Sequence, residues 1–139
     1  MNINNAVFHI NKEKGVIICI LPNTQEAFID FVSLNFSVIQ YYPNKMYNKL
    51  LMPKSFIGVA TLADGDTWDE DFGKFLAYSR ARDKYNKSFF KRAATFINEM
   101  ETSIDQMVNV INLYGKSLEK SSIYRHNKIN LREKDIPTA

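Results

Sequence analysis

Residues 88–120 read SFFKRAATFINEMETSIDQMVNVINLYGKSLEK, and this stretch decides the fold. A large apolar residue recurs every seven positions, and a second apolar residue follows three positions after each of the first four. These are the a and d positions of a heptad repeat, which predicts a helix from about 88 to 120. The a positions hold Phe90, Ile97, Ile104, Ile111 and Leu118, and the d positions hold Ala93, Met100, Met107 and Tyr114.

The predicted helix is too long for the chain to bury by itself. It would measure about 50 Å at 1.5 Å per residue, whereas a compact domain of this size is only ~30 Å across. Part of the apolar seam therefore needs another helix or another chain. We expect a homo-oligomer of at least two copies, with the interface at Ile97, Ile104, Met107 and Ile111.

A shorter helix is predicted just before the long one, over about 67–85. Thr67 and Glu70 have the spacing of a capping box, and acidic residues fill the first turn, where the helix dipole favours negative charge. Gly73 inside this helix costs about 1 kcal/mol relative to alanine, which indicates close approach to a sheet or a ligand. The segment 86–88 is expected to break or bend the chain before the long helix.

The first half of the chain predicts mainly strands. Residues 5–11 and 15–21 are apolar and β-branched, and the short segment between them ends in Gly15, which is a hairpin pattern. Further strands are predicted at 38–42 and 56–62, and Gly58 in the last one indicates a bulge or close packing.

One short helix interrupts these strands. It is predicted over about 24–35, because Asn23 and Glu26 have capping-box spacing and apolar residues follow at helical intervals. The segment 43–55 lies between two prolines and is expected to be a loop.

Together these elements predict an α+β fold: a small antiparallel sheet with a short helix, followed by two C-terminal helices, the second long with an a/d heptad seam. We expect one domain over 1–121, mainly strands in 1–64 and helical in 67–121. Residues 122–139 are expected to be a flexible basic tail.

Composition excludes several classes of protein. The 139 residues are 45% hydrophobic and 24% charged with a net charge of +3, which argues against disorder. No apolar run reaches the ~18 residues needed to span a bilayer, so no membrane partner is expected. The single cysteine, Cys19, cannot form an internal disulfide, which favours a reducing cytosol.

Basic residues are concentrated in one segment. Residues 74–92 hold seven bases against one acid, and Arg80, Lys84, Lys87 and Lys91 follow one another at helical spacing. Such a face attracts phosphate, nucleic acid or an acidic protein, so these four residues are the candidate ligand-binding residues. The alternative is a solvated helix face, neutralised by acids elsewhere.

Catalytic motifs are missing from the sequence. The five acids of 64–71 do not fit the spacing of a calcium loop, and helix capping accounts for them without a metal. His9 and Cys19 each lie between apolar neighbours, as structural residues do. We therefore expect no enzyme activity, no catalytic residues, no metal and no cofactor.

Residues 58–84 (GVATLADGDTWDEDFGKFLAYSRARDK) resemble a module found in small phage and prophage proteins of Gram-positive bacteria. In that module a strand ends in an acidic turn, followed by an aromatic–Asp pair and a helix. The matching positions are Asp66, Trp68, Asp69, Gly73, Leu76, Ala77, Arg80, Ala81 and Lys84. The Cys-His pair that usually ends the strand is replaced here by Thr61-Leu62-Ala63-Asp64.

The resemblance implies a phage origin and a strand-to-helix element. Phage anti-defence factors are similar in size and layout, including sponges for nucleotide immune signals and anti-CRISPR proteins. We therefore expect a non-enzymatic inhibitor in the host cytoplasm that antagonises a defence system, either by sequestering an anionic, nucleotide-type ligand or by blocking a host protein. The alternative is a DNA- or RNA-binding accessory phage protein.

Overall fold

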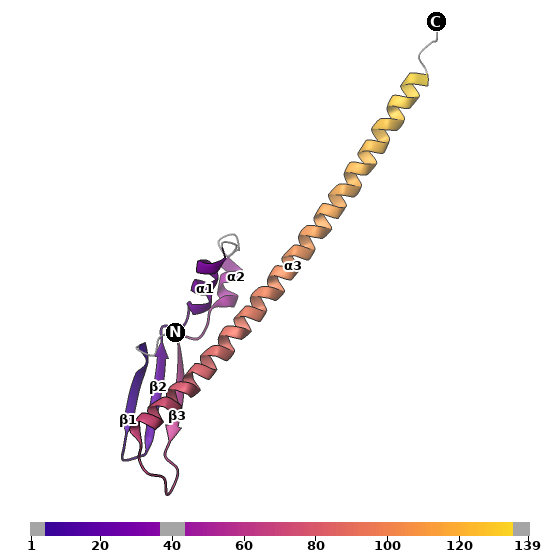
Figure 1. Ribbon diagram of the computed structural model, residues 1–139. Coiled ribbons are helices and arrows are strands. Elements are labelled where there is room, and N and C mark those ends of the chain that lie inside the picture. Colours follow the sequence, from indigo (N-terminus) through magenta and orange to yellow (C-terminus); the bar gives the residue numbers. More distant parts are fainter. Residues whose placement is uncertain (1–4, 37–43, 135–139) are drawn as a thin grey trace. The chain divides into compact units, whose positions relative to one another are not determined.

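The computed structural model describes residues 5–36 and 44–134 (Figure 1). The described elements are β1 (Val7–Asn11), β2 (Val16–Pro22), α1 (Ala27–Asn35), α2 (Asn44–Leu50), β3 (Ser55–Thr61) and α3 (Glu70–Lys134). A small three-stranded antiparallel sheet, short helices and a long C-terminal helix confirm the predicted α+β class. The chain divides into two units, residues 1–97 and residues 98–139.

The sheet of the first unit has the order β1-β2-β3, with both pairs antiparallel. The predicted hairpin forms, and Gly15 closes its turn with a φ of 64° while its N–H donates to the carbonyl of Lys12. That positive φ suits glycine, which has no Cβ to clash. In the centre of the sheet, Cys19 on β2 lies opposite Phe8 on β1 and Gly58 on β3.

One face of the sheet packs against the first turns of α3. On β3 the buried side alternates through Phe56, Gly58 and Ala60, as a strand with one covered face should. A Cβ on Gly58 would collide with the backbone of Ala77 and Ala81, both fully buried on α3. The glycine is therefore where the strand and the helix touch, as the sequence predicted for close packing.

Gly73 makes a second close approach between α3 and the sheet. A Cβ there would lie 2.5 Å from Cδ1 of Ile17, a fully buried residue of β2. The predicted approach of this helix to the sheet is thus confirmed. Small residues at 58, 73, 77 and 81 let the backbone of α3 lie directly on the strands.

A second part of the core joins α1, α2 and α3 within the first unit. Phe28 and Val32 of α1 and Leu50 of α2 are almost completely buried. The ring of Phe28 meets Phe89 edge-to-face at 5.1 Å and Phe96 at 6.1 Å. Such aromatic pairs add about 1 kcal/mol beyond the area that they bury.

The start of α1 differs from the prediction. Asn23 adopts a left-handed conformation with a φ of 57°, and no side-chain hydrogen bond caps the helix, which begins at Ala27. Instead, the completely buried Thr24 donates from Oγ1 to the carbonyl of Pro53 at 2.6 Å. The capping box of Asn23 and Glu26 is therefore wrong, because a tertiary hydrogen bond orients this turn.

Three further boundaries also differ. The segment 43–55 is not all loop, since α2 occupies Asn44–Leu50. The break expected at 86–88 is wrong, because α3 is continuous from Glu70 to Lys134 and passes well beyond residue 120. Residues 86–88 contain neither glycine nor proline, so nothing in them forces the helix to end. The strand predicted at 38–42 lies outside the described residues.

The N-cap of α3 also lies two residues later than the sequence predicts. The N–H of Phe72 donates to Oδ1 of Asp69 at 3.1 Å, which makes Asp69 the capping side chain in place of Thr67. We expect Asp69→Ala to lower the free energy of unfolding by about 1 kcal/mol in denaturant titrations. Thr67→Ala is the matched control and should have a much smaller effect. A larger loss of stability from Thr67→Ala than from Asp69→Ala would show that Thr67 is the capping residue.

Candidate functional site

Two of the four candidate ligand-binding residues bind the edge of the sheet. Nη1 of Arg80 donates to the carbonyl of Val59 at 2.6 Å, and Nζ of Lys84 donates to the carbonyl of Ile57 at 2.8 Å. Further along α3, Nε of Arg92 donates to the carbonyl of Leu51 at 2.8 Å. These bases therefore tie α3 to β3 and to the segment that precedes it.

The physical reason lies in the sheet order. Among the described strands β3 is at the edge of the sheet, and the carbonyls on its outer side have no further strand to pair with in residues 5–36 and 44–134. Long cationic side chains from a neighbouring helix satisfy such carbonyls with charge-assisted hydrogen bonds. Arg80 and Lys84 are one helical turn apart and Val59 and Ile57 are two strand residues apart, so the two spacings match.

Lys87 and Lys91 differ from the first pair. Both are exposed on α3, and their side chains have no hydrogen-bond or ionic partner within residues 5–36 and 44–134. The structure does not bring them into the cavity described below. Ligand binding by Arg80, Lys84, Lys87 and Lys91 stays a prediction.

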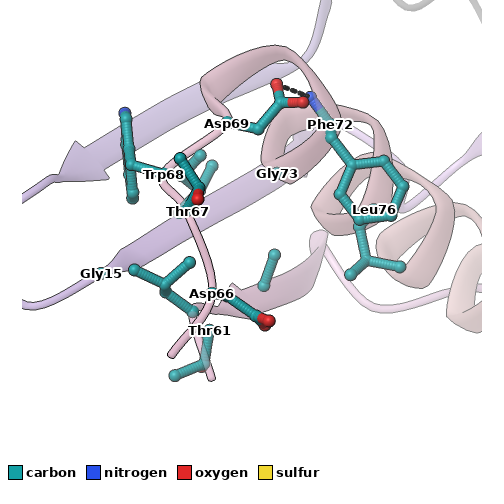
Figure 2. A pocket seen from close by; sticks show the side chains of 12 residues that line it. Gly15, Thr61, Asp66, Thr67, Trp68, Asp69, Phe72, Gly73 and Leu76 are labelled. Atoms are coloured by element: carbon teal, nitrogen blue, oxygen red, sulfur yellow. Dashed lines mark hydrogen bonds between the residues drawn. The ribbon is translucent and has the colours of Figure 1, made fainter. Parts of the chain in front are cut away.

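A cavity of about 390 Å³ lies where α3 begins over the end of the sheet (Figure 2). Its walls include the apolar side chains of Ile17, Trp68, Phe72 and Leu76, and the carboxylates at its rim come from Asp66 and Asp69. Both acids are exposed. The cavity combines aromatic rings with negative charge, which suits a cationic or apolar group and disfavours phosphate.

The sequence contained a signal for this cavity that could have been used. Helix capping is the role that the sequence predicts for the five acids of 64–71. Capping is right for Asp69, but Asp66 lines the cavity instead. Only the fold brings Ile17 of β2 to the other wall, because it is far away in the sequence.

The second face of the sheet, which we call the open face, carries an apolar patch bordered by polar residues at His9, Asn11, Ser55 and Thr61. Side chains that point away from α3 include Val7 on β1, Ile18 and Ile20 on β2, and Ile57 and Val59 on β3. Val7, Ile57 and Val59 are 45%, 44% and 39% exposed. Antiparallel sheets normally carry polar residues on a solvated face, so the apolar patch within this face is unusual.

The predicted oligomer interface consists of exposed apolar residues. Ile97, Ile104, Met107 and Ile111 are between 54% and 64% exposed. Large apolar side chains of this kind rarely face water in a row. Self-association through them stays a prediction.

Cys19 is buried in the sheet, and the two histidines, His9 and His126, are exposed. Burial raises the pKa of the Cys19 thiol, which disfavours the thiolate that a nucleophile needs. His126 forms a contact of 3.2 Å with Asn130 on the exposed surface of α3. No cluster of three or more metal-ligating side chains is found among the described residues.

Within the described ranges, no helix has the length and apolarity needed to cross a membrane. Comparison of the chain with protein-family models, with curated proteins and with solved structures finds no match.

Proposed function

We propose that the chain is a non-enzymatic binding protein that acts by contacting another protein through its open face. The observation that supports this proposal most strongly is the row of β-branched side chains at Val7, Ile20 and Ile57, which are opposite one another across the three strands. Val7 and Ile57 are each close to half exposed. Exposed apolar patches on a folded domain are typical of protein-interaction surfaces.

The sequestration of a nucleotide-type anion has less support. Arg80, the base best suited to grip a phosphate, already donates to β3, and so does Lys84. An anion would have to compete for these side chains or rely on Lys87 and Lys91, whose side chains are exposed on α3. The cavity beside α3 carries Asp66 and Asp69, which repel phosphate.

The resemblance of residues 58–84 to phage modules supplies the setting of the proposal. In that setting the protein is a phage-encoded inhibitor in the host cytoplasm, and its target is a protein of a host defence system. The open face would cover a surface of that target and so block it. Binding of this kind needs complementary apolar area and no catalytic group.

The test is a plating assay. Bacteria that carry defence systems singly would express the protein, and phage plating would be compared with and without it. We expect the wild-type chain to restore plating against at least one system. Val7→Lys combined with Ile57→Lys should abolish this effect, because two charges would be buried in the contact. Lysine is tolerated on edge strands, so circular dichroism and the melting temperature should change little.

The matched comparison is Lys87→Glu combined with Lys91→Glu, which reverses the unpartnered bases and leaves the open face intact. We expect this variant to keep full activity. Loss of activity in this variant alone would contradict the proposal and favour an anionic ligand. Binding to long DNA or RNA that weakens steeply with salt would instead favour the nucleic-acid accessory role.

A further inference from the structure

The helix of the second unit carries an uncovered apolar seam. Between residues 101 and 133 every side chain is exposed. The a and d positions nevertheless hold Ile104, Met107, Ile111, Tyr114 and Leu118. Together with the neighbouring valines, their exposed fractions correspond to roughly 800 Å² of side-chain area for one chain, which is about what a standard interface takes from each partner.

The residues that border this seam also suit contact with another helix. The e and g positions, which border a and d, hold Ser103, Val108, Val110, Gly115 and Ser117. Between 98 and 120 the charged side chains lie at b, c and f, with Glu101 at an e position as the exception. A face that is apolar or small over four heptad positions, with charges opposite, fits tight packing against another helix.

Charge along this helix is divided into two halves of opposite sign. Residues 98–112 hold three acids and no base: Glu99, Glu101 and Asp105. Residues 113–133 hold five bases (Lys116, Lys120, Arg125, Lys128 and Arg132) and two acids, Glu119 and Glu133. The first half is therefore −3 and the second half is +3.

This division determines which orientation of two copies is favourable. A parallel pair would place the acidic halves side by side and the basic halves side by side, so like charges would repel. An antiparallel pair places each acidic half beside a basic half, so the potentials of the two copies are complementary. We propose that α3 pairs with a second copy of this chain in the antiparallel orientation.

In an antiparallel coiled coil a positions face d positions, and we assign the register that also places acidic residues level with basic ones. Ile111 then faces Tyr114 of the second copy, and Met107 faces Leu118 of the second copy. In the same register Asp105 lies level with Lys120 of the second copy, and Glu101 lies close to the level of Arg125 of the second copy. This alignment is centred between residues 112 and 113, and its apolar layers lie between residues 107 and 118, because Ile104 is level with Ser121 of the second copy.

The pairing uses the helix of the second unit and does not depend on the open face. Its test is a distance measurement between spin labels in the full-length protein. Asn98→Cys and Asn112→Cys place labels at exposed polar positions outside the seam. Cys19 is completely buried, and labelling of the unsubstituted chain checks that it stays unmodified.

The antiparallel register predicts different distances at the two sites. Labels at Asn112 lie near the centre of the pair and should be roughly 20 Å apart, about two helix diameters. Labels at Asn98 should be separated by about 45 Å along the axis, at 1.5 Å per residue. Light scattering should report twice the chain mass of 16.1 kDa.

Two results would overturn the inference separately. Short distances at both sites would show a parallel pair, and a mass of 16.1 kDa at micromolar concentration would show that the chain is a monomer. A monomer that still restores phage plating would remove the pairing and leave the proposed function standing. A protein that pairs but fails to restore plating would contradict the proposed function and leave the pairing standing.

Discussion

Gly58→Ala is expected to lower the free energy of unfolding of the first unit by about 3 kcal/mol or more. The added methyl group would meet the carbonyl of Ala77 and the N–H of Ala81, both backbone atoms of α3. Neither atom can rotate away as a side chain can, so the whole helix must shift from the sheet. With a total stability of about 5–15 kcal/mol, the loss should be plain in thermal and denaturant unfolding.

Gly115→Ala is the matched control for this substitution. It adds the same methyl group to a glycine of α3 that has nothing within 4 Å of the new Cβ. Because Gly115 lies in the second unit and alanine favours a helix by about 1 kcal/mol relative to glycine, this variant should leave the stability of the first unit undiminished. Equal stability of the Gly58→Ala protein and the wild type would show that β3 and α3 are not in direct backbone contact.

Ile111→Asp is expected to dissociate the antiparallel pair. Each chain would bring a carboxylate into the central layers, where the second copy's Tyr114 covers position 111. Burying an unpaired charge costs several kcal/mol, so the dissociation constant should rise at least about 100-fold. Light scattering at micromolar concentration should then report the mass of one chain, 16.1 kDa.

Asn112→Asp controls for charge and for helix propensity. It introduces the same residue one position later, at a b position on the exposed side of the helix. This variant should stay paired. If both variants dissociate equally, added negative charge would be the cause, and the proposed seam would not be the interface.

Several parts of the fold could be predicted because they depend on local patterns. The hairpin, the strand at β3 and the long helix are encoded by alternation, by a glycine turn and by heptad spacing. Gly58 predicts a bulge or close packing, and Gly73 predicts close approach to a sheet or a ligand, since a glycine inside a strand or helix is unfavourable unless contact requires it. The structure confirms both contacts.

The roles of Arg80 and Lys84 could not be predicted in the same way. Their spacing shows that they share a helix face, but their partners are carbonyls 21 and 27 residues away in the sequence. Every residue has a carbonyl, so the sequence does not reveal which ones lack a strand partner. That depends on β3 being at the edge of the sheet.

The open face could not be predicted from the sequence for a related reason. Ile57 and Val59 alternate with Phe56 and Ala60, so β3 is apolar on both sides and its sequence is typical of a strand buried on both faces. Only the placement of α3 on one side leaves the other exposed. The same placement brings Ile17 to the cavity that Trp68 and Phe72 also line (Figure 2).

The sequence by itself determined the element types, the apolar seam and the separation of charge along α3, because these depend on side chains a few residues apart. The tertiary structure alone decided which bases bind β3, which sheet face stays open and where the cavity lies. Those features depend on pairs of residues that the folded chain brings together. A local pattern shows which side chains share a face of a helix or strand, and the fold determines which residues those side chains contact.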